Sequence, residues 1–313
     1  RLLFIQGAVA LRLTRKRKAV KVKVPRYSVW RRNRVRRSAD DIIEASINDG
    51  LFDREYRMSV RTFRKLAVIL NPSLSPGRKS RNDGIETTSK LLMTLRWLAG
   101  ASYMDIARIH GVSVPTVYRC VRETIHAITR SDIGRLKWPK DVRECEAYSS
   151  EWSKLSHLCS GYRGLFRTHV GAIDGLLIKT KTPSMKETKK QSEFRSGHKK
   201  QTGLNMQAVC DARLRFIFAS VKCPGKTNDI NAFRHSKLSD LVALLPAGYF
   251  LSGDNAYIND NHILSPFPGH EYGTREDTFN YFLSQLRIRI EMAFARLVGR
   301  WGILWRPLLV PLR

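Results

Sequence analysis

The sequence predicts a mixed α/β domain preceded by an all-helical region. Apolar residues recur at helical spacing over residues 39–128. After Trp138 and Pro139 the pattern changes to short, apolar, β-branched runs, which are typical of buried strands. Three such runs, then a helix, a further strand and a long helix form an α/β pattern. A chain of 313 residues suits one main domain with a lesser one.

The helical region begins with a predicted helix over residues 40–47. Ser59 is predicted to cap a second helix, which Asn71 and Pro72 end, because the residue before a proline avoids the helical conformation. A third helix begins at Thr88, and Gly100 ends it.

Residues 103–122 are typical of a helix-turn-helix. Gly111 stands where the turn needs a residue that tolerates positive φ, and Ser113 is placed to cap the second helix. His110 falls where an apolar residue normally packs. The residues expected to contact DNA are Ser113, Thr116, Arg119 and Arg122. The alternative is a helical hairpin that binds nothing, and the net charge favours DNA binding.

The predicted strands cover residues 169–179, 204–209, 214–221 and 249–251. Thr227 or Asn228 is expected to cap a short helix between the third and fourth strands. A helix over residues 278–298 carries an apolar stripe. The predicted domains are a basic, disordered arm at 1–39, a helical region with the helix-turn-helix at 40–135, and the α/β domain at 165–313.

The charge of the chain indicates a polyanionic partner. Lys and Arg number 56 against 27 Asp and Glu, so the net charge is +29. Such an excess points to nucleic acid or an anionic membrane surface, and no apolar run approaches the roughly 20 residues that span a bilayer. Nucleic acid is therefore favoured and a membrane is not expected. The basic arm fits a DNA contact or a nuclear import signal, with translated sequence upstream of the true start as the alternative.

The cysteines indicate a reducing compartment. There are 5, with no C-x-x-C pair, so neither a disulfide framework nor a zinc site is expected. The chain begins with Arg1 rather than Met, which suggests a fragment or a trimmed gene model.

Carboxylates stand at three informative places in the α/β pattern. Asp174 lies inside an apolar strand, Asp254 follows the end of the fourth strand, and Glu291 lies inside the long helix. Each has a plainer interpretation, respectively a bulge bonded to backbone amides, a turn residue, and an ion pair with Arg287. Together, acids from two strands and a helix can converge to hold two Mg²⁺ or Mn²⁺ ions about 4 Å apart for phosphodiester displacement.

At these residues the chain resembles the PIF/Harbinger superfamily of transposases and the related domesticated nuclease proteins of eukaryotes. The matching stretches are VGAIDG (170–175), GLNMQAVCD (203–211), PGKTNDINAF (224–233), GDNAY (253–257), LSQLRIRIEMAFARLVGRWGIL (283–304) and, upstream, FDREYRMSVRTFRKL (52–66). The order and spacing of these stretches carry the resemblance, which covers roughly residues 40–310.

The resemblance implies a ribonuclease-H-like catalytic domain with a DDE triad at Asp174, Asp254 and Glu291. Asp229 matches a further recurrent acid, ranked below the triad as a metal ligand. Ala295 departs from the family, which usually has glycine there, without touching a carboxylate. The family typically inserts at short AT-rich targets and works with a separate Myb-like protein. A nuclear location and a homo-oligomer on paired DNA ends are also expected.

Basic residues between the first two strands are expected to follow DNA phosphates, chiefly Arg195, Lys199 and Lys200. The leading hypothesis is a DDE transposase that cleaves transposon ends and joins the 3′-hydroxyls to target DNA. The alternatives are a domesticated DNA-binding protein and a host nuclease without strand transfer.

Overall fold

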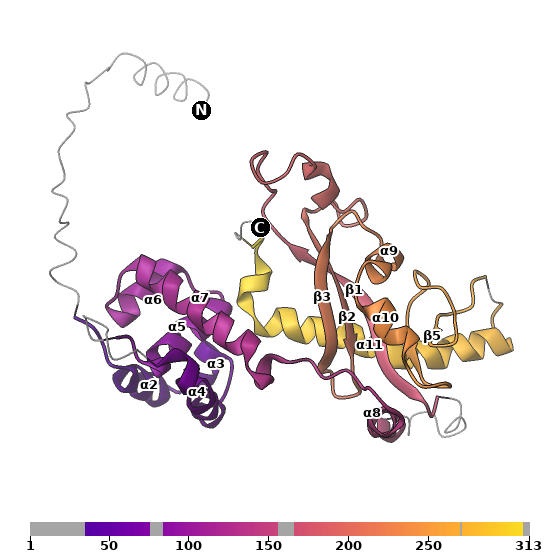
Figure 1. Ribbon diagram of the computed structural model, residues 1–313, viewed down its shortest axis with the longest axis horizontal. Helices are drawn as coiled ribbons and strands as arrows, with labels where there is room; N and C mark the ends of the chain where they lie inside the picture. The colour runs from indigo at the N-terminus through magenta and orange to yellow at the C-terminus, as the bar shows by residue number, and fades with distance from the viewer. Residues whose placement is uncertain (1–34, 76–83, 156–165, 270, 309–313) are drawn as a thin grey trace, which may run out of the picture. The chain divides into compact units, whose positions relative to one another are not determined.

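The structure is a computed structural model that describes residues 35–75, 84–155, 166–269 and 271–308 (Figure 1). The basic arm predicted at residues 1–39 lies almost entirely outside the described residues. The chain divides into Arg1–Arg36 and a compact unit, Arg37–Arg313, which contains the helices and strands of the fold.

Six helices form the first part of this unit. They are α2 (Ala39–Asn48), α3 (Phe52–Tyr56), α4 (Val60–Leu74), α5 (Thr87–Leu98), α6 (Tyr103–His110) and α7 (Val114–Arg130). Phe63, Leu91 and Leu92 are fully buried in the core shared by α2, α3, α4 and α5. Burying such side chains stabilises the packing by about 1.5–3 kcal/mol each.

The end of α4 corrects one prediction. Ser59 caps the helix, accepting a hydrogen bond from the Thr62 amide at 3.3 Å, but Pro72 does not end it, because the helix runs to Leu74. Proline removes only the bond to the carbonyl four residues earlier, at Val68. Val68 is 73% exposed, so water can satisfy that carbonyl.

The predicted pair of helices at residues 103–122 is present as α6 and α7. Gly111 ends α6 with φ 62°, and the Ser113 hydroxyl accepts from the Thr116 amide at 3.3 Å, which caps α7. The residues predicted to pack between the helices are buried, namely Ile106, Val112, Val117 and Cys120. His110 shares this interior and is only 2% exposed. DNA binding by this pair remains a prediction.

A five-stranded sheet in the order β3-β2-β1-β4-β5 forms the second part. Its strands are β1 (His169–Lys179), β2 (Gly203–Cys210), β3 (Phe216–Pro224), β4 (Phe250–Ser252) and β5 (Ile263–Leu264). β1, β2 and β3 are antiparallel neighbours, whereas β4 runs parallel to β1 and β5 runs parallel to β4. The mixed α/β class predicted from the sequence is therefore confirmed.

The third strand begins later than predicted, at Phe216 rather than Leu214. The Asp211 carboxylate accepts from the amides of Arg213 at 2.9 Å and Arg215 at 2.8 Å, and Leu214 takes φ 63°. These bonds hold residues 211–215 in a tight turn, which shortens the strand. The prediction also omitted four elements, namely α3, α8 (Val142–Leu155), α10 (Leu238–Ala243) and β5.

Different helices cover the two faces of the sheet (Figure 1). The long helix α11 (Arg275–Arg300) packs Ile290 and Phe294 against the face of Ala172 and Ala208. The short helix α9 (Asp229–Arg234) and α10 pack on the other face, against Ile173 and other buried residues. Three 3₁₀ turns complete the described elements, at Asp132–Gly134 (η2), Gln191–Phe194 (η4) and Gly302–Trp305 (η5).

Candidate functional site

Asp174 occupies the middle of β1, opposite Ala208 of β2. Side chains alternate along a strand, so Asp174 lies on the α11 face, together with Ala172. The pKa of Asp174 is raised from 3.8 to about 6, chiefly by burial; the nearby Asp254 and Asp229 also raise it, while the Gly175 amide and Arg287 oppose the rise. The site therefore gathers negative charge around a carboxyl group in a largely buried position.

Asp254 follows β4 on the strand neighbouring Asp174. Ala172 of β1 pairs in parallel with Ser252 of β4. Asp174 and Asp254 each lie two residues beyond this pair, so the two acids are at the same level in neighbouring strands. Asp254 also accepts from the Ala256 amide at 3.0 Å, which is the turn bond that the plainer interpretation predicted. The register nonetheless brings Asp254 close enough to affect the pKa of Asp174.

Asp229 is held by side chains from the middle of β2. Its Oδ1 accepts from Asn205 Nδ2 at 2.9 Å and from Gln207 Nε2 at 3.0 Å. The Gln207 carbonyl oxygen in turn accepts from the Tyr257 hydroxyl at 2.7 Å. Asn228 caps α9, which settles the alternative with Thr227 and positions Asp229 in its first turn. The acid is thus fixed by a connected polar cluster on the α9 face.

Gly175 lets Asp229 approach β1. A Cβ atom on Gly175 would overlap the Asp229 carboxylate and would also lie 2.9 Å from Gln207 Nε2. Gly175 pairs with Gln207 across the β1–β2 ladder. The missing side chain is therefore what allows the α9 acid to lie beside the strand that carries Asp174.

Glu291 is not gathered with the other acids. Its carboxylate accepts from Arg287 Nη1 at 2.9 Å, and the side chain is 50% exposed. This is the ion pair that the plainer interpretation predicted. Arg287 also lowers the pKa of Asp174, so its positive charge acts on Asp174 in β1 while it is paired with Glu291. Glu291 is one helical turn further along.

The donor chemistry of the site fits a hard divalent cation. Carboxylate oxygens are the ligands that Mg²⁺ and Mn²⁺ prefer, and neighbouring carboxylates that disfavour each other's ionisation would be relieved by a cation. Within the described ranges, however, no three His, Cys, Asp or Glu side chains are arranged to hold a metal ion. Asp174 and Asp254 are adjacent, whereas Glu291 would have to leave Arg287 to join them.

The residues predicted to contact DNA differ in their exposure and in the bonds that they already make. Arg195, Lys199 and Lys200 are exposed in the segment between β1 and β2. Arg119 and Arg122 are exposed on α7, and Arg119 lies 3.9 Å from Glu123. Ser113 and Thr116 bond each other at 2.7 Å within the cap of α7.

The sequence interpretation missed Asn205, Gln207 and Tyr257 as site residues. Asn205 and Gln207 are two residues apart in an otherwise apolar strand, a spacing that puts both side chains on one face. That signal was present in the sequence. Tyr257 gave none, because its partner lies far away in the chain.

Comparison with known proteins identifies the class. Residues 173–312 match the family described as DDE superfamily endonuclease. The matched range contains Asp174, Asp229, Asp254 and Glu291. The resemblance to Harbinger-type transposase-derived nucleases is confirmed by this match and by the relatives.

The relatives are distant. The chain is 23% identical over 289 residues to "Protein ALP1-like" of Arabidopsis thaliana, which covers 85% of this chain and 68% of the relative. It is 25% identical over 205 residues to "Putative nuclease HARBI1" of Xenopus laevis, covering 64% of this chain and 54% of the relative. The chain thus spans about half the length of the second relative. No solved structure matches the chain significantly.

Proposed function

We propose that this protein is a metal-dependent DNA endonuclease of ribonuclease-H-like fold that cleaves transposon ends and joins the 3′-hydroxyls to target DNA. The observation that carries the proposal is the pair Asp174 and Asp254, presented side by side by two parallel strands. An antiparallel β1-β2-β3 unit extended by parallel β4 and β5 supports the fold. The net charge of +29 supports a DNA substrate.

In this proposal Asp174, Asp254 and Glu291 hold two Mg²⁺ or Mn²⁺ ions, and Asp229 shapes the site from the α9 face or adds a ligand. Divalent ions supply activation of a water or 3′-hydroxyl nucleophile and stabilisation of the departing oxygen. Arg287 acts as a positioning residue. A DNA phosphate competes for its guanidinium, because Arg forms strong paired hydrogen bonds with phosphate, and this competition frees Glu291.

The same proposal assigns the remaining partners. Exposed Arg119 and Arg122 on α7 bind the element end, with Ser113 and Thr116 at the start of the same helix. Arg195, Lys199 and Lys200 contact phosphates near the site. The protein acts in the nucleus as a homo-oligomer with a Myb-like partner. Within the described ranges, no helix has both the length and the apolar character needed to cross a bilayer.

The test is DNA cleavage by the purified chain, with Mg²⁺, Mn²⁺ or chelator, on DNA that carries the inverted repeats flanking its coding sequence. Cleavage should require the ion and should fall at least about 100-fold in Asp174→Asn and Asp254→Asn, the loss expected when a metal ligand goes. Activity that survives both substitutions excludes this site as the centre of cleavage. Joining of labelled 3′-hydroxyl ends to a plasmid tests strand transfer separately.

A nuclease without transposition is the second candidate, and the relative named as a nuclease favours it. It predicts metal-dependent cleavage with no joined product in the same assay. Many genomic copies of the coding sequence between terminal inverted repeats would favour the transposase instead.

A further inference from the structure

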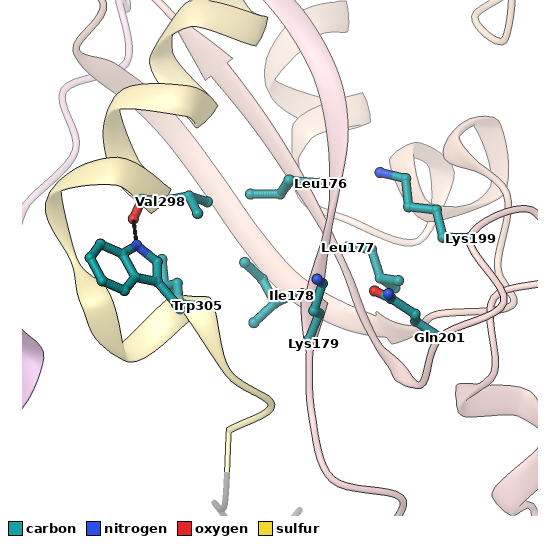
Figure 2. A pocket seen from close by; sticks show the side chains of 9 residues that line it. Leu176, Leu177, Ile178, Lys179, Lys199, Gln201, Val298 and Trp305 are labelled. Atoms are coloured by element: carbon teal, nitrogen blue, oxygen red, sulfur yellow. Dashed lines mark hydrogen bonds between the residues drawn. The ribbon is translucent and has the colours of Figure 1, made fainter. Parts of the chain in front are cut away.

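A cavity of about 360 Å³ lies at the end of β1, beyond the carboxylates, with Val298 and Trp305 on one side of the strand and Lys199 and Gln201 on the other (Figure 2). Its walls include Leu176, Ile178 and Val298, with Trp305 and the lysines Lys179 and Lys199. Figure 2 shows Leu176 and Ile178 pointing from β1 toward Val298 and toward the ring of Trp305. The volume lies within the roughly 300–1,000 Å³ typical of small-ligand pockets.

Trp305 is held in a fixed orientation at this cavity. Its indole Nε1 donates to the Val298 carbonyl at 2.7 Å. The side chain is nevertheless 59% exposed, so a face of the ring is available. The polar edge of the ring is therefore already bonded, while its face is open and can stack against a flat group.

The charge around the cavity is positive. Lys179 and Lys199 line it, and both are exposed. Neither is paired with an acid among the salt bridges of the described residues, which suits phosphate binding. An apolar slot with an aromatic platform and flanking ammonium groups matches a nucleotide, whose base is flat and whose backbone is anionic.

The position fits the proposed reaction, on which this inference rests. Leu176 lies on the same face as Asp174 and about 7 Å further along the strand, at roughly 3.3 Å per residue. Val298 lies about 10 Å beyond Glu291 along the helix, at roughly 1.5 Å per residue. With about 3.4 Å of rise per nucleotide, these distances equal about two to three nucleotides.

We propose that the cavity between β1, the end of α11 and Trp305 is a nucleobase-binding pocket. It receives one base, unstacked from a DNA strand about two to three nucleotides from the scissile phosphate, against Trp305. Lys179 and Lys199 contact the phosphates beside that base. Enzymes that act on DNA unstack bases at a cost of a few kcal/mol, which stacking on an aromatic side chain offsets.

The first test measures the anisotropy of a fluorescent single-stranded dT 12-mer bound to the full chain, in chelator, over a series of salt concentrations. Trp305→Ala should weaken binding about 5- to 150-fold, the range for loss of one stacked base, without changing the salt dependence. Trp305→Phe should retain most of the affinity. Tyr281→Ala is the control, because this exposed α11 aromatic is 62% exposed and does not line the cavity.

Lys179→Ala should act differently. It should reduce the slope of log affinity against log salt by about 0.7, the value for one phosphate contact on a single strand. Equal affinity of wild type and Trp305→Ala would overturn the pocket, and so would equal losses in Trp305→Ala and Tyr281→Ala.

A second measurement needs no variant. Wild-type protein is irradiated with an oligonucleotide containing 5-iodouracil at successive positions, and the crosslinked peptide is identified by mass spectrometry. Crosslinks should fall on Trp305, and crosslinks confined to other residues would contradict the proposal. Crosslinks to Trp305 in a protein without metal-dependent cleavage would support the pocket and contradict the proposed nuclease function. Metal-dependent cleavage with crosslinks only at other residues would support the nuclease function and contradict the pocket.

Discussion

The carboxylate of Asp229 lies in the space that a side chain on Gly175 would fill. The two residues come from different elements, since Asp229 begins α9 and Gly175 follows Asp174 in β1. One acid therefore reaches the strand of another through a position that lacks a side chain.

Gly175→Ala should displace Asp229 and lower DNA cleavage at least about 10-fold, because the added methyl overlaps the carboxylate and crowds Gln207. Overpacking of this kind costs about 1–3 kcal/mol. Cleavage rates and urea unfolding measure the two effects. Gly299→Ala on α11 is the control, since nothing lies within 4 Å of its added Cβ, and alanine there should stabilise the helix by about 0.5–1 kcal/mol.

Gln207→Leu should destabilise the protein by about 1–3 kcal/mol, the cost of leaving buried polar partners unbonded. Gln207 is 1% exposed and joins Tyr257 to Asp229. Tyr257→Phe removes only one of these bonds, so its loss should be smaller. Unfolding of both single variants and the double variant gives the coupling, and purely additive losses would contradict a connected cluster.

Asp174→Asn should stabilise the metal-free protein at pH 8. The pKa of Asp174 is raised to about 6 from 3.8, chiefly by burial, so wild-type stability falls as pH rises between these values. The variant avoids this loss, which is about 1–3 kcal/mol, and the two proteins should converge near pH 4. Adding Mg²⁺ should raise the melting temperature of wild type alone, and an equal rise in both would argue against Asp174 as a ligand.

Glu291→Gln should abolish detectable cleavage while leaving stability almost unchanged. The side chain is half exposed, and its ion pair with Arg287 contributes only about 0.3–0.5 kcal/mol. Arg287→Gln should lose a similar small stability but retain more activity, since Glu291 remains. Full cleavage by Glu291→Gln would show that Arg287 pairing, rather than catalysis, is the role of this acid.

His110→Leu should make the protein more resistant to acid. Both ring nitrogens of His110 are buried without a hydrogen-bond partner among the described residues, and burial lowers its pKa from 6.5 to about 4. As pH falls, His110 is therefore protonated in the unfolded chain before it is protonated in the folded protein, and stability is lost between about pH 6.5 and 4.

The loss attributable to this histidine is about 2–3 kcal/mol. Urea unfolding of wild type and His110→Leu at pH 7 and pH 4.5 measures it. The exposed His126→Gln on α7 serves as the control. Parallel pH profiles for wild type and His110→Leu would rule out the buried imidazole as the acid-sensitive group.

Sequence periodicity predicted the sheet well because its strands are buried and apolar. β1 has the predicted bounds of residues 169–179, since most positions in it are apolar or glycine. Turn chemistry was harder to predict, because the Asp211 carboxylate shortened β3 through bonds that periodicity cannot reveal. α8 was missed since its buried side chains, Cys145, Ser149 and Trp152, do not form a continuous apolar stripe.

The candidate site was predicted in part. Asp174 and Asp254 are neighbours because strand order makes them so, and that order follows from the α/β pattern. Glu291 could not be placed from sequence, because the rotamer of a half-exposed side chain depends on its competing partner Arg287. The cluster of Gln207 and Tyr257 depends on contacts between distant segments, which a single sequence does not record.

The dependence of Asp229 on Asn205 and Gln207 has an evolutionary consequence. None of the three can change alone without leaving a buried donor or acceptor unmatched. The three positions should therefore be inherited as a unit among related chains. In a lineage released from selection for cleavage, they should drift together, and the loss of one should be followed by the loss of the other two.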